Sequence, residues 1–250
     1  MSSNLDQWNF YFGRVDGALA STFVNLSLID RAPVPGFADC VFVSLTLRSP
    51  RDDGLSSKQE FDALTVIEDR LSQVIASQGG LFAGRVTHAG RRDFFAYFKE
   101  AQSSKRALLK FQAEFAHYQM DIGARTDPAW QIYSDYLYPN AFALQHIRNR
   151  DVLMALQRNG DASGQPRKID HFAYFPDLDA AQGFAHAARE VGFTIADIGQ
   201  TAGETDEVLV QFHRNDAPHD IDQVTDAIIG ALQGAVGRYD GWGCDVQRPN

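Results

Sequence analysis

The residues best suited to chemistry gather near the C-terminus, in the stretch "GRYDGWGCDV" at residues 237–246. It combines a phenol, carboxylates, an indole and a thiol with three glycines. A phosphate cradle needs its glycines ahead of a helix N-terminus, whereas these follow an expected helix. A nucleophilic Cys244 needs a basic companion, and the local sequence places none beside it. The pattern therefore favours a final strand with a structural or partner-facing role.

In such a strand, successive side chains point to opposite faces of the sheet. Strict alternation predicts two sets: Trp242, Cys244 and Val246 on one face, and Tyr239, Gly241 and Gly243 on the other. Trp242 would then anchor the sheet to its helices, because a large indole contributes most when it is buried. The glycines would permit a bulge or the close approach of another backbone.

The seven histidines and two cysteines show no metal-binding pattern. None of the histidines occurs as HxH, HxxxH or HExxH, and Cys40 and Cys244 suffice for neither a four-ligand zinc site nor a disulfide framework. We therefore expect no metal, no cofactor and a reducing cytoplasmic environment. The first residues lack a signal-peptide pattern, and no apolar run approaches about 18 residues, so we expect neither export nor a membrane span.

The stretch "RRDFFAYFK" at residues 91–99 suggests a second kind of site. A basic, aromatic central strand is how ferredoxin-like RNA-recognition domains stack bases. Phe95 and Tyr97 share one face and could stack on a ligand, while the other aromatic residues face the opposite side. The small residue required after the basic one is missing, since Arg92 and Asp93 stand there. RNA or small-ligand binding here therefore remains an alternative to a buried, two-faced strand.

The net charge of the chain is confined to its last ninety residues. Residues 1–160 hold 17 basic and 17 acidic residues, whereas residues 161–250 hold 6 and 15, a net charge of −9. Such a field repels nucleic acid and attracts basic protein segments. Some acidic residues cap helices. Among the acidic residues of this half, those that we expect to contact a basic partner are Asp177, Asp179, Asp220 and Asp222. No carboxylate pair accompanies a nucleophile, so we predict a binding protein and no enzyme.

The second half of the chain shows a βαββαβ order of elements. The expected strands are 168–175, 193–198, 206–214 and 237–246, and the expected helices are 176–192 and 219–237. This order is typical of a ferredoxin-like sheet with two helices on one face. Both sets of alternate residues in strand 168–175 include apolar side chains, so the sequence does not decide which face of this strand is buried.

The first half repeats that order after two extra strands, residues 7–15 and 19–29. Its expected strands are 38–47, 81–90, 91–99 and 119–126, with helices at 57–80 and 103–118. The fold class is therefore α+β, with two ferredoxin-like βαββαβ sandwiches. The Gly-, Asp-, Ser- and Pro-containing stretch 159–168 predicts a boundary between domains 1–160 and 161–250, with 127–160 an aromatic and then helical connection.

Both halves resemble known families. The closing "YDGWGCDV", with "IDHFAYFPDLDAAQGFAHAAREVGF", resembles the family called regulator of ribonuclease activity B over about residues 165–247. Residues 5–160, including "WNFYFGRVDG" and "YPNAFALQHIRNRDVLMALQRNGD", look like the family named domain of unknown function 695.

The resemblance to the regulator family implies a non-enzymatic acidic protein that binds ribonuclease E and restrains RNA turnover. Basic segments of that nuclease would bind the acidic domain in place of RNA, a partner class that agrees with the charge distribution. The motif positions carried over from the family are Tyr239, Asp240, Gly241, Trp242 and Gly243, together with His171 and Phe172. The large N-terminal half departs from the short single-domain regulator.

Overall fold

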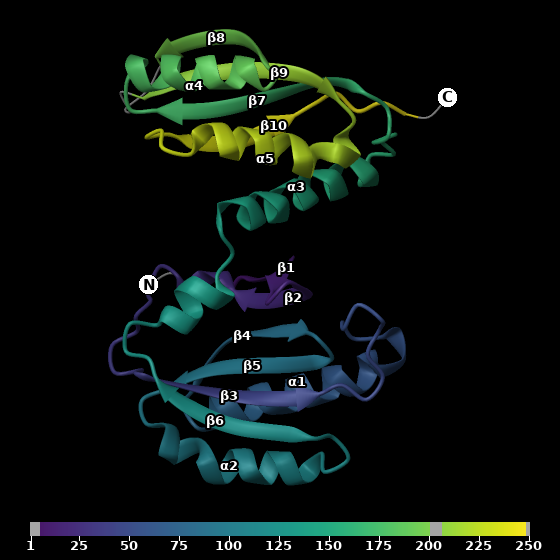
Figure 1. The fold of residues 1–250 in the computed structure, drawn as a ribbon, viewed down its shortest axis with the longest axis vertical. Helices are drawn as coiled ribbons and strands as arrows, with labels where there is room; N and C mark the ends of the chain where they lie inside the picture. The colour runs from purple at the N-terminus through teal and green to yellow at the C-terminus, as the bar shows by residue number, and fades with distance from the viewer. Residues whose placement is uncertain (1–5, 201–206, 249–250) are drawn as a thin grey trace. The chain divides into compact units, whose positions relative to one another are not determined.

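The computed structural model describes residues 6–200 and 207–248, which form two compact units, Met1–Pro139 and Asn140–Asn250 (Figure 1). Each unit contains one antiparallel sheet with helices. The expected βαββαβ order occurs in both units, and two extra strands precede it in the first.

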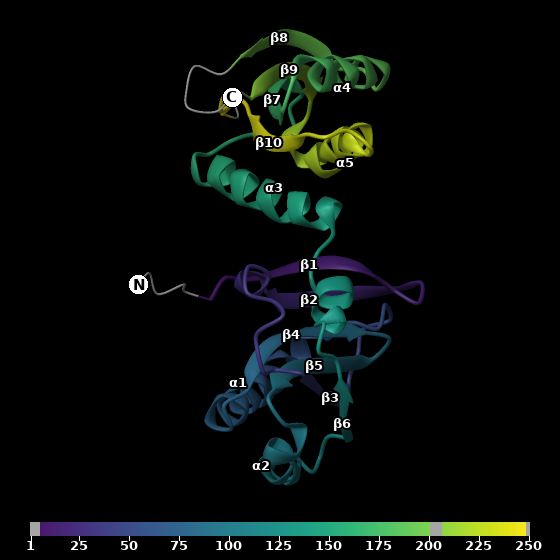
Figure 2. The same ribbon diagram turned by 90° about the vertical axis from the view of Figure 1, so that its left-hand side faces the viewer.

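The first unit contains a six-stranded sheet in the order β1-β2-β4-β5-β3-β6. The strands are Trp8–Val15 (β1), Ala18–Asn25 (β2), Asp39–Thr46 (β3), Leu81–His88 (β4), Arg91–Phe98 (β5) and Met120–Thr126 (β6). The helices Phe61–Ser77 (α1) and Ala101–Glu114 (α2) cover one face of β3 and β5, where apolar residues at helical spacing meet alternate strand residues (Figure 2).

A second layer covers the other face of this sheet. The residues after β6 form the short π-type helix Ile132–Leu137 (η3). Trp130, Tyr133 and Leu137 are buried there with Tyr97 and residues of β2 and β4. The central strand β5 is consequently buried on both sides, which explains why aromatic residues occur in both of its alternations.

The second unit contains a four-stranded sheet in the order β10-β7-β9-β8. The strands are Arg167–Phe175 (β7), Thr194–Gln200 (β8), Val208–Asp216 (β9) and Arg238–Gly243 (β10). The helices are Ala141–Arg158 (α3), Leu178–Glu190 (α4) and Ile221–Leu232 (α5). Helices α4 and α5 cover one sheet face, and α3 lies beside α5 (Figures 1 and 2).

The unit boundary lies about twenty residues before the position expected from turn chemistry. Helix α3 belongs to the second unit because Leu156 is part of its core and Val152 and Leu153 pack against that core. Counted over residues 140–250, 9 basic and 16 acidic residues give a net charge of −7. The helix therefore moderates the expected acidic field by bringing in Arg148, Arg150 and Arg158.

Strand β7 buries its odd-numbered residues. Ile169, His171, Ala173 and Phe175 are each at most 1% exposed and face the helices. The even-numbered residues, including Phe172, point to the face that the helices leave uncovered. This resolves the alternation that the sequence left open.

Candidate partner-binding site

The closing motif forms β10, and a bulge changes its alternation. Tyr239 pairs with Ala173 and Trp242 with His171, with a register shift between Tyr239 and Gly241. Asp240 is therefore an extra residue, and Tyr239 and Trp242 both face the helices. The expected placement of these two rings on opposite faces is wrong. Gly241 has φ +143°, a backbone conformation that favours glycine at this bulge.

Tyr239 contacts a buried histidine. Its hydroxyl lies 2.7 Å from Nδ1 of His171, whose side chain is fully buried and stacks on Phe212. Burial, assisted by the nearby charge of Arg214, lowers the pKa of His171 to about 3. Burial also raises the pKa of Tyr239. Both groups are therefore neutral near pH 7, and the pair serves as an internal hydrogen bond.

Trp242 connects to two helices through one asparagine. Its Nε1 donates to Oδ1 of Asn149, a fully buried residue of α3, at 2.9 Å. Asn149 Nδ2 donates to Asp222 Oδ1 and Thr225 Oγ1 on α5, both at 2.8 Å. Gln145 Nε2 donates to the same Asn149 Oδ1 at 2.9 Å. We call these five residues the Asn149 network.

The Asn149 network joins the closing motif, through Trp242, to Asp222 on α5. The roles of Asn149 and Gln145 could not be read from the motif itself. The available signal was two amides four residues apart among the buried positions Ala143 and Ile147. An amide on the buried side of a helix requires partners, and here it fixes α3, α5 and β10 together.

The four acidic candidates do not form one patch. Asp177 caps α4 by accepting a hydrogen bond from Ala180 N at 2.8 Å, and Asp179 is exposed in the first turn. Asp220 is exposed at the start of α5, 3.2 Å from His219 Nε2. Because β7 and β9 are antiparallel, the starts of α4 and α5 lie at opposite ends of the sheet (Figure 1).

The rest of the motif points to the uncovered sheet face. Gly241 and Gly243 pair with Phe172 and Asp170, and a Cβ at either glycine would meet nothing within 4 Å. The face of β10 at these two positions is therefore open space. Asp240 is exposed and accepts a hydrogen bond from Arg238 at 2.8 Å.

Cys244 has a basic neighbour, contrary to the expectation from the local sequence. Arg167 Nε donates to Cys244 Sγ at 3.3 Å from a position 77 residues away in the chain. Nη2 of the same guanidinium donates to both carboxylate oxygens of Asp161 at 2.7 Å, and the two side chains are 4% and 0% exposed. Asp161 also accepts from the backbone of Gln247. The arrangement ties down the C-terminal segment.

Of the proposed stacking residues in the first unit, Tyr97 is fully buried. Its ring stacks on Trp130 with 3.9 Å between centroids, and its hydroxyl donates to Asp127 at 2.7 Å. Phe95 contacts Tyr136 edge-on at 5.7 Å. The chain's own aromatic segment therefore occupies the face on which a base would have to stack.

One polar cluster in the first unit resembles a hydrolytic triad in composition. Ser44 donates to Asp93, whose other carboxylate oxygen lies 3.5 Å from His88 Nε2. A triad needs the imidazole between the serine and the carboxylate, so that it can accept the serine proton. Here the carboxylate lies between them, and Arg91 donates to the serine. The cluster therefore lacks the arrangement of a serine nucleophile.

Across residues 6–200 and 207–248, no group of three or more His, Cys, Asp or Glu side chains could hold a metal ion. No helix in this described part of the chain has the length and apolar character needed to span a bilayer.

Comparison with known families divides the chain in the same way. The model of the "Family of unknown function (DUF695)" matches residues 6–138, more than half of the chain, and the chain belongs to this family. The model named "Regulator of ribonuclease activity B" matches residues 146–244, which span most of α3 and all of β7 to β10. The fusion of two families inferred from the sequence motifs is thus confirmed.

Among curated proteins, none matches the chain. Similar solved structures include an unknown protein from Galdieria sulphuraria, at 7% identity over 81% of this chain and 96% of that one, with a TM-score of 0.22. A mutant chlorite dismutase from Candidatus Nitrospira defluvii is 10% identical over 82% of this chain and 87% of that one, with a TM-score of 0.23. Similarity at this level does not bear on function.

Proposed function

We propose that the protein is a cytoplasmic, non-enzymatic regulator of a ribonuclease, and that residues 140–250 make the regulatory contact. The observation that carries this proposal is the family match over residues 146–244. The ribonuclease E class of nuclease is the first target to test. We also assign both units to the ferredoxin-like class, on the basis of the βαββαβ order and the strand orders β6-β3-β5-β4 and β10-β7-β9-β8.

The contact that we propose is electrostatic. The second unit has a net charge of −7, which would attract basic segments of a nuclease and compete with RNA for them. The buried Tyr239 and Trp242 would support this surface from below. The exposed Asp179, Asp220 and Asp240 would meet the partner directly.

The test is calorimetric titration of the full chain with the noncatalytic region of ribonuclease E over a salt series. We expect a Kd of about 1 μM or tighter at low salt, and weaker binding as salt rises. One double variant, Asp179→Asn with Asp240→Asn, neutralises the α4 end of the sheet. A single variant, Asp220→Asn, neutralises the α5 end. Exposed ion pairs contribute modestly, so we expect the variant at the end that contacts the partner to bind about threefold to tenfold more weakly.

The matched control is Asp62→Asn with Asp121→Asn, which removes the same charge from exposed positions of the first unit. It should leave the affinity unchanged. Absence of binding at low salt, or binding that responds equally to the control and to the second-unit variants, would refute the proposed mechanism.

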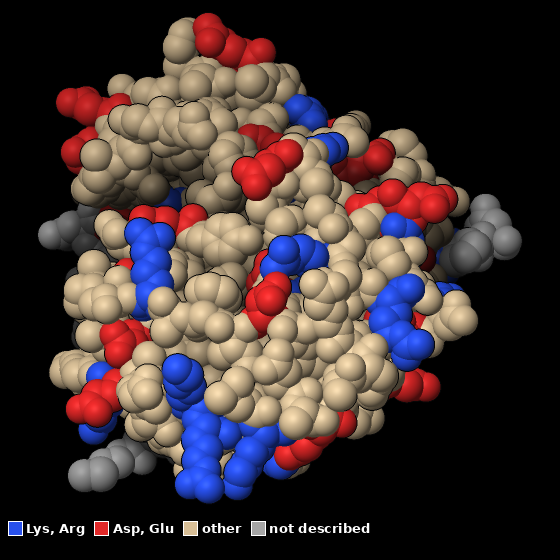
Figure 3. All heavy atoms as spheres, turned by 60° about the horizontal axis from the view of Figure 1, so that its bottom comes forward, with Lys and Arg blue, Asp and Glu red and all other residues tan. Residues whose placement is uncertain are grey.

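The alternative that strand 91–99 binds RNA or a small ligand has less support. Tyr97 is covered by Trp130, and Figure 3 shows Lys and Arg side chains interspersed with Asp and Glu over the face in view. The first unit has 14 basic and 16 acidic residues, a net charge of −2, which does not favour a phosphate backbone.

A further inference from the structure

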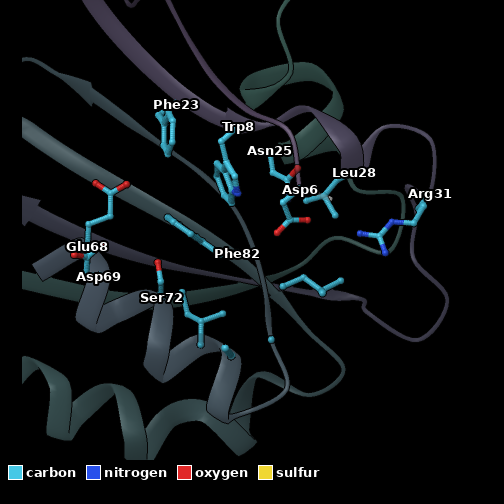
Figure 4. Close-up of a pocket in the computed structure, with 14 residues that line it drawn as sticks. Asp6, Trp8, Phe23, Asn25, Leu28, Arg31, Glu68, Asp69, Ser72 and Phe82 are labelled. Atoms are coloured by element: carbon cyan, nitrogen blue, oxygen red, sulfur yellow. The ribbon is translucent and has the colours of Figure 1, made fainter. Parts of the chain in front are cut away.

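The first unit contains a cleft of about 510 Å³ beside the two extra strands (Figure 4). Helices α1 and α2 cover β3 and β5, while β2 and the edge strand β1 extend the sheet beyond them. The space between these strands and α1 is the cleft, and its volume lies in the range of small-ligand sites. The cleft is separate from the ribonuclease-regulator part of the chain and does not depend on the proposed function.

Three aromatic rings form the wall of this cleft. Trp8 stacks on Phe23 with 5.0 Å between centroids and is tilted against Phe82 at 5.3 Å. Along the same face of β1, Phe10 and Phe12 are 41% and 57% exposed. The edge strand therefore presents an aromatic surface that leads into the cleft. Exposed aromatic surface of this kind commonly marks an interaction site.

Carboxylates lie on both sides of the aromatic wall. In Figure 4, Trp8 and Phe82 lie between Asp6 on one side and Glu68 with Asp69 on the other. Arg85 neutralises Glu68 through a 2.6 Å contact. Asp6 and Asp69 are exposed, and Arg31 is the one Lys or Arg among the described residues that line the cleft.

The protein already binds one of its own cations in this way. The Arg85 guanidinium lies 5.0 Å from the centre of the Phe23 ring while it pairs with Glu68. Trp8, the next ring along the wall, has Asp6 on one side, and Asp69 lines the same cleft beyond Phe82 on the other side. Tryptophan is also the aromatic side chain that attracts cations most strongly.

We propose that this cleft binds an organic cation, a guanidinium or ammonium group on an apolar stem. The cation lies over Trp8 and pairs with Asp6 or Asp69, and the stem packs on Phe82. The same group can come from a free amine or from an arginine or lysine side chain of a peptide. The peptide source would also use Phe10 and Phe12 outside the cleft.

Tryptophan fluorescence of the full chain provides the assay, because Trp130 and Trp242 are 0% and 8% exposed, which leaves Trp8 as the more accessible reporter. The probes are agmatine, a short arginine-containing peptide with blocked ends, and the same peptide with citrulline in place of arginine. We expect agmatine to bind with a Kd on the order of 1 mM, because one cation–π contact and exposed ion pairs are individually weak. A peptide Kd at least about tenfold lower would identify the peptide source.

Trp8→Leu should weaken binding of the charged probes by about tenfold. Calorimetry measures binding to this variant, because the fluorescent reporter Trp8 is lost. Asp69→Asn should weaken it about threefold, and Asp62→Asn on the same helix is the matched control. If Trp8→Leu does not fold, Asp6→Asn and Asp69→Asn still decide the question. Equal binding of the citrulline and arginine peptides, or no binding of either charged probe, would overturn the proposal.

Discussion

Replacing Asn149 by alanine provides the sharpest test of how the closing motif works. The variant removes the acceptor of Trp242 Nε1 and of Gln145 Nε2, two donors in buried surroundings. Thr225 keeps its bond to the carbonyl of Ile221, and Asp222 is exposed and can turn to water. The main cost is thus two unsatisfied buried donors, at about 1 to 3 kcal/mol each, so the second unit should lose about 2 to 6 kcal/mol.

Urea unfolding of the full chain, followed by circular dichroism and tryptophan fluorescence, measures this loss. With a urea dependence of about 2 kcal/mol per molar, the midpoint of the second unit should fall by about 1 to 3 M. The transition of the first unit should not move, because the network lies within residues 140–250. Asn140→Ala, which removes only the N-cap of α3, is the control and should cost about 1 kcal/mol.

A double-mutant cycle separates the Trp242 bond from general damage to α3. Trp242→Phe removes the indole N–H that Asn149 accepts. If the bond matters, the double variant should be less destabilised than the sum of the two single variants, by about 0.5 to 3 kcal/mol. Strict additivity, or an Asn149→Ala cost no larger than that of Asn140→Ala, would refute the proposed role of the network.

Three further predictions concern His171, the glycines of β10 and Tyr97. The folded-state pKa of His171, about 3, lies below the ordinary 6.5, so the unfolded state binds more protons between these two pH values. The stability of the second unit should therefore fall as the pH drops below 6.5, by up to about 1.4 kcal/mol per pH unit from this group. His171→Phe should reduce this pH dependence in urea titrations. Gly241→Ala should cost about 1 to 3 kcal/mol at its positive φ, whereas Gly243→Ala, with open space and no such φ, should change urea stability by less than about 0.5 kcal/mol. Tyr97→Phe should destabilise the first unit by about 1 to 3 kcal/mol in thermal and urea unfolding, because Asp127 and the backbone N–H of Tyr133 both lose the hydroxyl; an unchanged first-unit transition would contradict the assigned contacts.

The order of elements could be predicted because it depends on local patterns. Alternating strands and helical apolar spacing gave the βαββαβ order of both halves and the two extra strands, with ends that differ by a few residues. The expected helix 219–237 has the largest error at a single end, since α5 ends at Leu232 and Gly234 follows with a positive φ. A glycine inside an apolar helical pattern can end a helix, and the pattern alone does not show which one does.

The domain boundary could not be predicted from turn chemistry. The Gly-, Asp-, Ser- and Pro-containing stretch 159–168 reads as a linker, but Asp161 and Arg167 form a buried pair across it. That pair joins residues whose contact is fixed by the tertiary fold. Helix α3 likewise carries amides on its buried side, so its sequence gave little sign that it packs on α5.

A contact between residues far apart in the sequence also explains why Tyr97, expected as a stacking residue, is buried. Its strand has the composition of an aromatic binding platform, and local sequence does not reveal that Trp130 lies on the ring. The cleft of the first unit shows the converse case. Trp8, Phe23 and Phe82 come from three separate strands, and only their pairing in the sheet brings the rings together. The sequence of each of these strands therefore contains only one of the three rings.

Apart from the exposed Asp240, the closing Tyr-Asp-Gly-Trp-Gly string is therefore better understood as a fold signature than as a set of contact residues. Tyr239 and Trp242 can face the core together only if a bulge lies between them, and the φ of Gly241 suits that bulge. Four of the five residues in the string then follow from a local requirement: two polar-tipped rings with buried partners, one extra residue, and a glycine at the positive φ of the bulge. Gly243 has no such requirement, because a Cβ there would meet nothing within 4 Å. If so, conservative changes at Tyr239 and Trp242 should alter stability before affinity, whereas changes at Asp179, Asp220 and Asp240 should alter affinity alone. That separation distinguishes a scaffold with an acidic surface from a motif that the partner reads directly.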